Sequence, residues 1–565
     1  MSERDSFMNA RPMLNAYPDS MGGRLSDIVD LLRHPDLKSV FESFYILPSV
    51  FNSDLDRGFS VIDYELNELY ARQEDLNAIR SLGMGLKLDF VLNHCSVLST
   101  QFQDIVEKGE RSAYRGFFID WNRFWDGSGE MTDAGYIQPR PELIEDMFFR
   151  KPGLPLLMVR FPDGRDVPYW NTFYQEVLHG HLDAQDLMDS MEIQYASAKD
   201  LAQHVNRAID AGVPVSEIPY GRYERFRASV TELLESRRRY MGQMDVNIDS
   251  PLVWEYYDQT LRTLAGYGAR IVRLDAFAYA PKAPGKRNFL NDPETWELLE
   301  RVRELADRYG LALLPEIHSG YWEGMHERIA AEGYVTYDFF LPGLILDALE
   351  TRSHETLVRW ARELRDKKLR TVNMLGCHDG IPLLDLKGLV PEERIESLIQ
   401  TVVARGGRVK SLHGQSELYY QVNATYFSAL GEDERKMLLA RAIQLFMPGK
   451  PQVWYLDLFA GRNDYEAVKH AGPGGHKEIN RTNLTVADVA ARLEQKVVRD
   501  QLTLLRFRNT SPAFGFDARL EVLDTPPGRL ALRWENDGSS AVLEADLETC
   551  GFTIAGGSGT LIYAQ

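Results

Sequence analysis

The chain has 565 residues, of which 44% are hydrophobic and 26% are charged, and its formal net charge at pH 7 is -19. This length suggests a large catalytic domain with smaller modules, and the composition is that of a globular protein, not a disordered one. The negative charge argues against a nucleic-acid partner, because binding phosphates requires clustered lysine and arginine.

Strand candidates alternate with helical stretches from the start of the chain. They are Met13–Tyr17, Ser43–Pro48, Leu86–Asn93, Arg270–Ala278, Leu311–Ile317, Val335–Leu341, Arg370–Leu375 and Gln452–Leu458. This alternation predicts a parallel sheet, and eight units over this length suit a closed (β/α)8 barrel of the TIM type, an α/β fold.

Two long gaps interrupt the alternation. Residues 96–245 separate the third strand from the fourth, and residues 380–450 follow the seventh. Insertions of this size after barrel strands usually build the walls of an active site. Within the first gap we expect a helix over 197–211, begun by a variant capping box that includes Asp200, and a second helix over 222–241.

Two further elements complete the prediction. Asp292 is expected to cap a helix opened by Pro293. After about Ser511, short alternating segments separated by glycine and proline predict a small antiparallel β domain. The expected division is a barrel over 1–95, 246–379 and 451–511, insertions over 96–245 and 380–450, and a C-terminal domain over 512–565.

The three cysteines, Cys95, Cys377 and Cys550, are too few and too widely spaced for a disulfide framework. No run approaches about 18 apolar residues, and the first residues do not form a secretory signal. We therefore expect a cytoplasmic protein without membrane contact, either a monomer or a homodimer.

Three carboxylates follow apolar, strand-like runs: Asp275, Glu316 and Asp379. If these runs are strands of one parallel barrel, the three acids converge at its carboxyl end, where such barrels carry out their chemistry. A pair of carboxylates flanking a glycosidic bond is the minimum machinery for cleaving that bond. The pattern therefore predicts an enzyme that acts on glycosides.

Four motifs occur in order around these acids: Asp89-Phe-Val-Leu-Asn-His94, Arg273-Leu-Asp275, Glu316 and His378-Asp379. Other stretches are Tyr17-Pro-Asp-Ser20, Asp56-Arg-Gly-Phe59, Lys151-Pro-Gly-Leu-Pro155, Leu386-Lys-Gly-Leu389 and Ile479-Asn-Arg481. With them, nearly the whole chain resembles the α-amylase superfamily (glycoside hydrolase family 13), and within it the sucrose phosphorylase group.

The resemblance implies a retaining mechanism through a covalent glucosyl enzyme. Asp275 would be the nucleophile and Glu316 the general acid and base, which requires that one stays ionised while the other holds a proton. Arg273, on the same strand face as Asp275, would keep that carboxylate ionised. Asp379 would hold sugar hydroxyls.

The resemblance also implies residues around these acids. Those expected to bind the substrate are Asp56, Phe59, His94, Arg273, His318, His378 and Arg481. On the acceptor side, Lys151, Tyr279 and His318 are expected to form a cationic and hydrogen-bonding patch for phosphate. Phosphate is a co-substrate, and no cofactor or metal is expected.

The sequence departs from the group at several points. Its members usually carry arginine where Lys151 stands, and lysine lacks the planar fork that binds phosphate in a bidentate manner. The loop after Asp379 is shorter than in sucrose-specific members, which leaves fructose recognition open. In α-amylases the residue equivalent to Asn93 binds calcium, although the phosphorylases do without it. A thiol nucleophile or metal site at Cys95 and Cys377 is less favoured than simple packing.

The sequence therefore predicts a retaining phosphorylase that transfers glucose from a small α-glucoside to phosphate, giving α-D-glucose 1-phosphate. Sucrose, glucosylglycerate, glucosylglycerol and a phosphorylated sucrose all stay open as substrates. An α-glucosidase or transglucosidase would use the same three acids. A catalytically silent sugar-binding scaffold would be expected to lack at least one of them, and none is missing.

Overall fold

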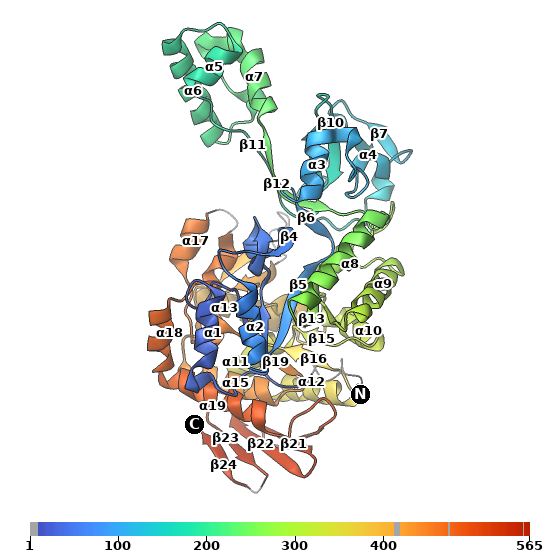
Figure 1. Cartoon of the computed structure of the whole chain (residues 1–565). Helices are drawn as coiled ribbons and strands as arrows, with labels where there is room; N and C mark the ends of the chain where they lie inside the picture. The colour runs from blue at the N-terminus through green and yellow to red at the C-terminus, as the bar shows by residue number, and fades with distance from the viewer. Residues whose placement is uncertain (1–8, 412–418, 473–474, 558) are drawn as a thin grey trace.

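The computed structural model describes residues 9–411, 419–472, 475–557 and 559–565 (Figure 1). Its central sheet has eight strands: β1 (Met13–Ala16), β2 (Ser43–Ile46), β5 (Gly85–Val91), β13 (Ala269–Asp275), β14 (Ala312–Pro315), β15 (Thr336–Asp338), β16 (Thr371–Asn373) and β19 (Lys450–Trp454). Their order is β14-β13-β5-β2-β1-β19-β16-β15, and the neighbours pair in parallel. The predicted (β/α)8 barrel, with all eight of its strands, is confirmed.

Helices follow the strands and cover the outside of the barrel. They are α1 (Leu25–Arg33), α2 (Gln73–Ser81), α8 (Pro251–Gly266), α9 (Glu294–Arg308), α10 (Met325–Ala331), α11 (Leu341–Thr351), α12 (Glu355–Asp366), α15 (Glu434–Phe446), α16 (Tyr455–Leu458), α17 (Tyr465–Ala471), α18 (Val486–Leu493) and α19 (Lys496–Thr510). Because both faces of each strand are covered, nearly every strand residue is buried, including the charged Lys87, Asp89 and Arg273.

The segment between β5 and β13 forms two bodies above the carboxyl end of the barrel. The first contains β6 (His94–Ser96), α3 (Thr100–Lys108), α4 (Trp121–Phe124), β7 (Gly129–Met131), β8 (Ile137–Pro139), β9 (Leu156–Arg160) and β10 (Asp166–Trp170). The second contains α5 (Ala184–Ser190), α6 (Tyr195–Asp210) and α7 (Arg227–Ser236), at the end of a hairpin of β11 (Gln175–Leu178) and β12 (Arg239–Asp245). Figure 1 shows this helical module standing away from the barrel, and it has its own apolar core.

Three details of the predicted helices are wrong. The helix α6 begins at Tyr195, and the carboxylate of Asp200 binds Arg222 and Tyr223 instead of capping the helix. The segment 222–241 is only partly helical, because its last residues belong to β12, which pairs with β6 and β11. The carboxylate of Asp292 is held by the guanidinium of Arg328, with both contacts at 2.8 Å, and caps no helix.

The segment between β16 and β19 adds α13 (Glu392–Ala404), β17 (Arg408–Ser411), β18 (Tyr419–Asn423) and α14 (Tyr426–Ala429) at the mouth of the barrel. A further hairpin, β3 (Phe51–Ser53) with β4 (Val61–Leu66), follows β2. None of the helices in the described part of the chain combines the length and the apolar character needed to span a bilayer.

The C-terminal segment is an antiparallel sheet, as predicted. Its strands are β20 (Arg519–Val522), β21 (Arg529–Asn536), β22 (Ser539–Asp546), β23 (Phe552–Gly556) and β24 (Leu561–Ala564). It lies at the opposite end of the barrel from the helical module (Figure 1). The indole of Trp534 donates to the carbonyl of Phe446 at 2.8 Å and fastens the sheet to α15.

Candidate active site

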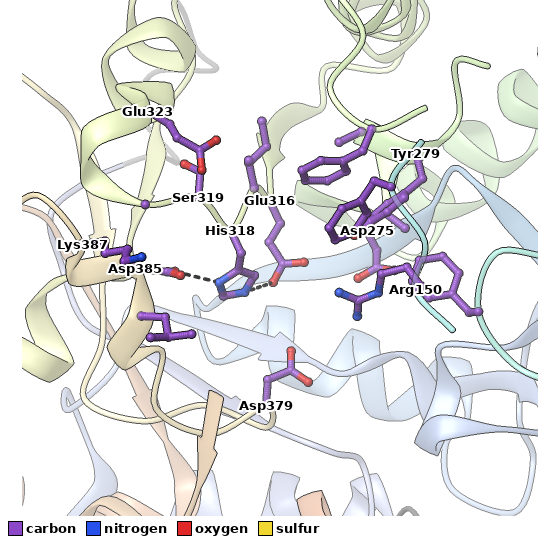
Figure 2. Close-up of a pocket in the computed structure, with 18 of the residues that line it drawn as sticks. Arg150, Asp275, Tyr279, Glu316, His318, Ser319, Glu323, Asp379, Asp385 and Lys387 are labelled. Atoms are coloured by element: carbon purple, nitrogen blue, oxygen red, sulfur yellow. Dashed lines mark hydrogen bonds and ion pairs between the residues drawn. The ribbon is translucent and has the colours of Figure 1, made fainter. Parts of the chain in front are cut away.

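The three predicted acids meet at the carboxyl end of the barrel. Asp275 is the last residue of β13, Glu316 follows β14 directly, and Asp379 lies in the loop after β16. All three line one cavity of about 1010 Å³ (Figure 2). Ala276, directly after Asp275, has a φ of 53°, and such left-handed residues other than glycine are concentrated at functional sites.

Arg273 connects the two acids predicted to be catalytic. Its guanidinium lies 3.1 Å from Asp275 and 2.5 Å from Glu316, both through one nitrogen, and its other terminal nitrogen binds Asp89. The two contacted carboxylate oxygens cannot lie further apart than these two distances combined, which is less than the separation of about 6.5–9.5 Å in inverting glycosidases. The spacing therefore fits the retaining arrangement of about 5–5.5 Å.

The pKa values of Asp275 and Glu316 shift in opposite directions in the ligand-free site. Burial raises the pKa of Asp275 to about 7. Burial acts in the same direction on Glu316, but the closer guanidinium of Arg273 lowers the pKa of that carboxyl group below its usual value. Because the two groups share one arginine and repel each other, they titrate as a pair that holds one proton near neutral pH.

Asp379 is held as a carboxylate by surrounding donors. Burial opposes its ionisation, but His378 at 3.1 Å, Lys477 at 2.6 Å and Arg481 at 3.8 Å together hold the pKa of Asp379 well below its usual range. Arg481 also lies 3.2 Å from Asp56, and Lys477 lies 3.6 Å from the same carboxylate. The structure thus brings the predicted pair of Asp56 and Arg481 against Asp379.

His94 and Phe59 form another part of the cavity wall. The Nε2 of His94 lies 3.0 Å from the carbonyl oxygen of Phe59, which can only accept, so this nitrogen carries the proton. Burial lowers the pKa of His94, which keeps the ring neutral. The ring of Phe59 stacks on His378 with centroids 5.0 Å apart. Arg273 and Arg481 bind carboxylates that line the cavity but do not line it themselves. The other predicted substrate-binding side chains all line it: Asp56, Phe59, His94, His318 and His378.

Behind this wall, a lysine occupies the position next to Asn93. The ammonium of Lys282 lies 3.0 Å from the side-chain oxygen of Asn93 and 2.7 Å from the carboxylate of Asp245. Asn93 and Asp245 are fully buried. The oxygen atoms that a calcium ion would be expected to bind are thus engaged by a cation of the chain itself.

His318 lines the same cavity beside Glu316. Its Nδ1 lies 3.1 Å from Asp385 and its Nε2 lies 3.8 Å from Glu316. Burial would lower the pKa of His318, but the hydrogen bond and charge of Asp385 raise it. Tyr279 also lines the cavity, and its phenol is hydrogen-bonded to Arg150.

The structure does not place Lys151 in the phosphate-binding patch of the cavity, where the sequence analysis expected it. It does not line the cavity, and its ammonium binds the side-chain oxygen of the buried Asn171. Burial lowers the pKa of Lys151 to about 8. The preceding residue, Arg150, points into the cavity instead (Figure 2). Of these two adjacent cations, the structure thus places Arg150 at the cavity and Lys151 outside it.

Sequence reasoning also missed Lys477, Asp385 and Arg287, all of which line the cavity. Lys477 precedes the recognised Arg481 by four residues, and a lysine at this spacing on a helical turn is a weak signal. Asp385 lies in the shortened loop after Asp379, where no pattern singles it out. Arg287 lies in the loop between β13 and α9.

A barrel with an arginine-bridged carboxylate pair and a third carboxylate at its carboxyl end defines the α-amylase class of glycoside-processing enzymes. Comparison with known proteins narrows this class. A sucrose 6(F)-phosphate phosphorylase from Ilumatobacter coccineus is 50% identical over 553 residues, covering 96% of this chain and 95% of that protein. A sucrose phosphorylase from Streptococcus mutans is 29% identical and covers 95% of both.

The crystal structure of a sucrose 6F-phosphate phosphorylase from Thermoanaerobacter thermosaccharolyticum matches with a TM-score of 0.80 and 30% identity over 98% of both chains. No protein-family model matches the chain. The chain belongs to the family of sucrose and sucrose 6(F)-phosphate phosphorylases. It is a glucoside phosphorylase, as its motifs predicted.

The shared proton predicts the pH dependence of the first chemical step. Above about pH 7 the pair of Asp275 and Glu316 loses its proton, and no acid is left to protonate the leaving oxygen. With a neutral glucoside such as sucrose, kcat/KM should therefore fall about tenfold per pH unit above that value. With α-glucosyl fluoride, whose leaving group needs no proton, it should not fall. The same decline with both substrates would contradict the assignment.

Proposed function

We propose that the protein transfers glucose from sucrose 6(F)-phosphate to inorganic phosphate, giving α-D-glucose 1-phosphate and fructose 6-phosphate with retention. The observation that carries this proposal is Arg287, a second guanidinium that lines the cavity in addition to Arg150. A neutral fructose requires no such charge, whereas guanidinium groups are well suited to a phosphate ester. The relative with 50% identity, named for this substrate, supports the choice.

The first step forms the covalent intermediate. The carboxylate of Asp275 attacks the anomeric carbon, while Glu316 protonates the oxygen of the leaving group. The productive state needs the proton on Glu316, although the ligand-free site favours Asp275. Since both carboxyl groups share Arg273, a leaving oxygen that accepts a hydrogen bond from Glu316 is enough to draw the proton across.

The second step returns the glucosyl group to phosphate. Phosphate enters the space left by fructose 6-phosphate, and an oxygen of the phosphate attacks the anomeric carbon as Asp275 departs. Glu316, now ionised, takes the proton of the attacking group. Both steps use only acid–base and nucleophilic groups, so we propose that no cofactor takes part.

The cavity must also let phosphate compete with water for the intermediate. In the glucosyl enzyme Asp275 is an uncharged ester, but Glu316 and Asp379 still repel a dianion, and a cationic patch is needed to offset them. We propose that Arg150, with the phenol of Tyr279 and with His318, forms this patch. The raised pKa of His318 fits the role, because a protonated imidazole donates from both nitrogens.

The substrate is tested by comparing sucrose 6(F)-phosphate, sucrose, glucosylglycerol and 2-O-α-glucosylglycerate, each with and without phosphate. We expect kcat/KM for sucrose 6(F)-phosphate to exceed that for sucrose by at least about 100-fold, since each charge-assisted hydrogen bond contributes about 1.5–3 kcal/mol. Glucose 1-phosphate should form only when phosphate is present. Equal or faster turnover of sucrose would overturn the substrate assignment, and release of glucose alone would indicate a hydrolase.

The roles of Asp275 and Glu316 can be distinguished by comparing substrates whose leaving groups do and do not need a proton. Asp275→Asn should reduce turnover of every substrate by at least about 10⁴-fold, because no nucleophile remains. Glu316→Gln should reduce turnover of sucrose 6(F)-phosphate strongly, but should spare the first step with α-glucosyl fluoride. Burst kinetics with the fluoride would show this, and an equal loss for both variants would reverse the roles.

Arg150 and Lys151 offer a matched pair of adjacent cations. Arg150→Ala should lower the ratio of glucose 1-phosphate to glucose by about 10- to 100-fold, because phosphate loses a charged partner while water does not. Lys151→Ala should change that ratio by less than about threefold. The ratio does not depend on how much enzyme is folded. A shift with Lys151→Ala and none with Arg150→Ala would restore the original sequence prediction.

A further inference from the structure

Four lysine and arginine side chains line the cavity in the described part of the chain, and three have partners. Lys477 lies 2.6 Å from Asp379, and Lys387 lies 3.2 Å from Glu392. Arg150 is hydrogen-bonded to Tyr279. The fourth, Arg287, has no carboxylate within ion-pairing distance among the described residues, although it is exposed to the cavity. A guanidinium without an internal anion is available for an anionic ligand.

Two aromatic rings hold the side chain of Arg287. Its guanidinium carbon lies 5.5 Å from the centre of the Phe148 ring and 5.4 Å from that of Phe289, and the two rings are 5.2 Å apart. Contact with ring faces stabilises the cation while its N–H edge stays free to bind oxygen atoms. Phe148 belongs to the segment between β5 and β13, and Phe289 belongs to the loop after β13. The position of Arg287 therefore depends on both walls of the cavity.

The backbone around Arg287 is fixed by hydrogen bonds. The side chain of the buried Asn288 accepts from the N–H of Ala283 at 2.9 Å, and that of the buried Asn291 accepts from the N–H of Asn288 at 2.9 Å. The carbonyl of Arg287 itself accepts from the N–H of Phe148 at 2.8 Å. A loop fixed in this way loses little entropy on binding, which favours a specific contact.

We propose that Arg287 recognises the phosphate ester of the leaving group and so determines the preference for a phosphorylated over a neutral fructosyl group. The assignment rests on the proposed function. It separates two tasks that the cavity must perform: Arg150 and Tyr279 serve the attacking phosphate, while Arg287, on its aromatic support, serves the ester. Figure 2 draws Arg150 and Tyr279 on the wall beside Asp275, across Glu316 from His318 and Lys387.

The test compares Arg287→Ala with Lys286→Ala. Lys286 is the adjacent cation, but it lies 3.6 Å from Glu294 and does not line the cavity. For Arg287→Ala, kcat/KM for sucrose 6(F)-phosphate should fall about 30- to 100-fold, kcat/KM for sucrose should change less than about threefold, and KM for inorganic phosphate should stay within about twofold. Lys286→Ala should leave all three values near those of the wild type. Arg287→Lys should retain part of the preference, because lysine supplies charge without the fork.

The outcomes distinguish the inference from the function on which it rests. If the wild type does not prefer sucrose 6(F)-phosphate, the proposed function itself fails. If the wild type prefers sucrose 6(F)-phosphate, but Arg287→Ala lowers kcat/KM equally for sucrose 6(F)-phosphate and sucrose, or for neither, the role of Arg287 is refuted. If Arg287→Ala increases KM for inorganic phosphate by as large a factor as it lowers kcat/KM for sucrose 6(F)-phosphate, Arg287 is assigned to the attacking phosphate instead. Inhibition by fructose 6-phosphate relative to fructose provides a binding readout, and only Arg287→Ala should remove the difference.

Discussion

The rest of the structure depends on the contact of one buried guanidinium, that of Arg273, with three carboxylates. A cation 2% exposed, beside Asp89, Asp275 and Glu316, can be stable only if each partner is held in place, since leaving one charge of such a group unpaired costs about 3–5 kcal/mol. The barrel meets this requirement because its parallel strands bring side chains distant in sequence to one level of the interior. Asp89 comes from β5, Arg273 and Asp275 from β13, and Glu316 from the end of β14.

The layer beneath supports this contact. The phenol of Tyr45 donates to both carboxylate oxygens of Asp89, at 2.9 and 2.8 Å. The amine of Lys87 lies 3.7 Å from the centre of the Tyr45 ring and 2.8 Å from the side-chain oxygen of Gln452. Burial lowers the pKa of Lys87 well below its usual value. Arg273 is the cation that contacts both Asp275 and Glu316, so their electrostatic environment depends first on its position.

Much of this arrangement is predictable from the sequence, because it is encoded locally. Each barrel strand contains a short apolar run, and each acid stands at or shortly after the end of such a strand. Arg150 and Lys151 show the limit of this reasoning. The backbone there follows neither a helical nor a strand period, so no pattern tells which of two adjacent cations faces the cavity. Lys477 reaches Asp379 only because the chain returns to the barrel mouth after β19, and contacts of this kind are set by tertiary structure alone.

The wall behind His94 shows a consequence of using a lysine as its internal cation. The ammonium of Lys282 links Asn93 and Asp245 by a hydrogen bond and an ion pair, and it is covalently attached to the chain. A bound ion exchanges with the medium, so a wall built on one weakens as the free ion becomes scarce. A lysine cannot diffuse away, and its charge is lost only by deprotonation. The integrity of this wall is thereby tied to proton activity and made independent of divalent-ion supply, which suits a phosphorylase, since phosphate sequesters such ions.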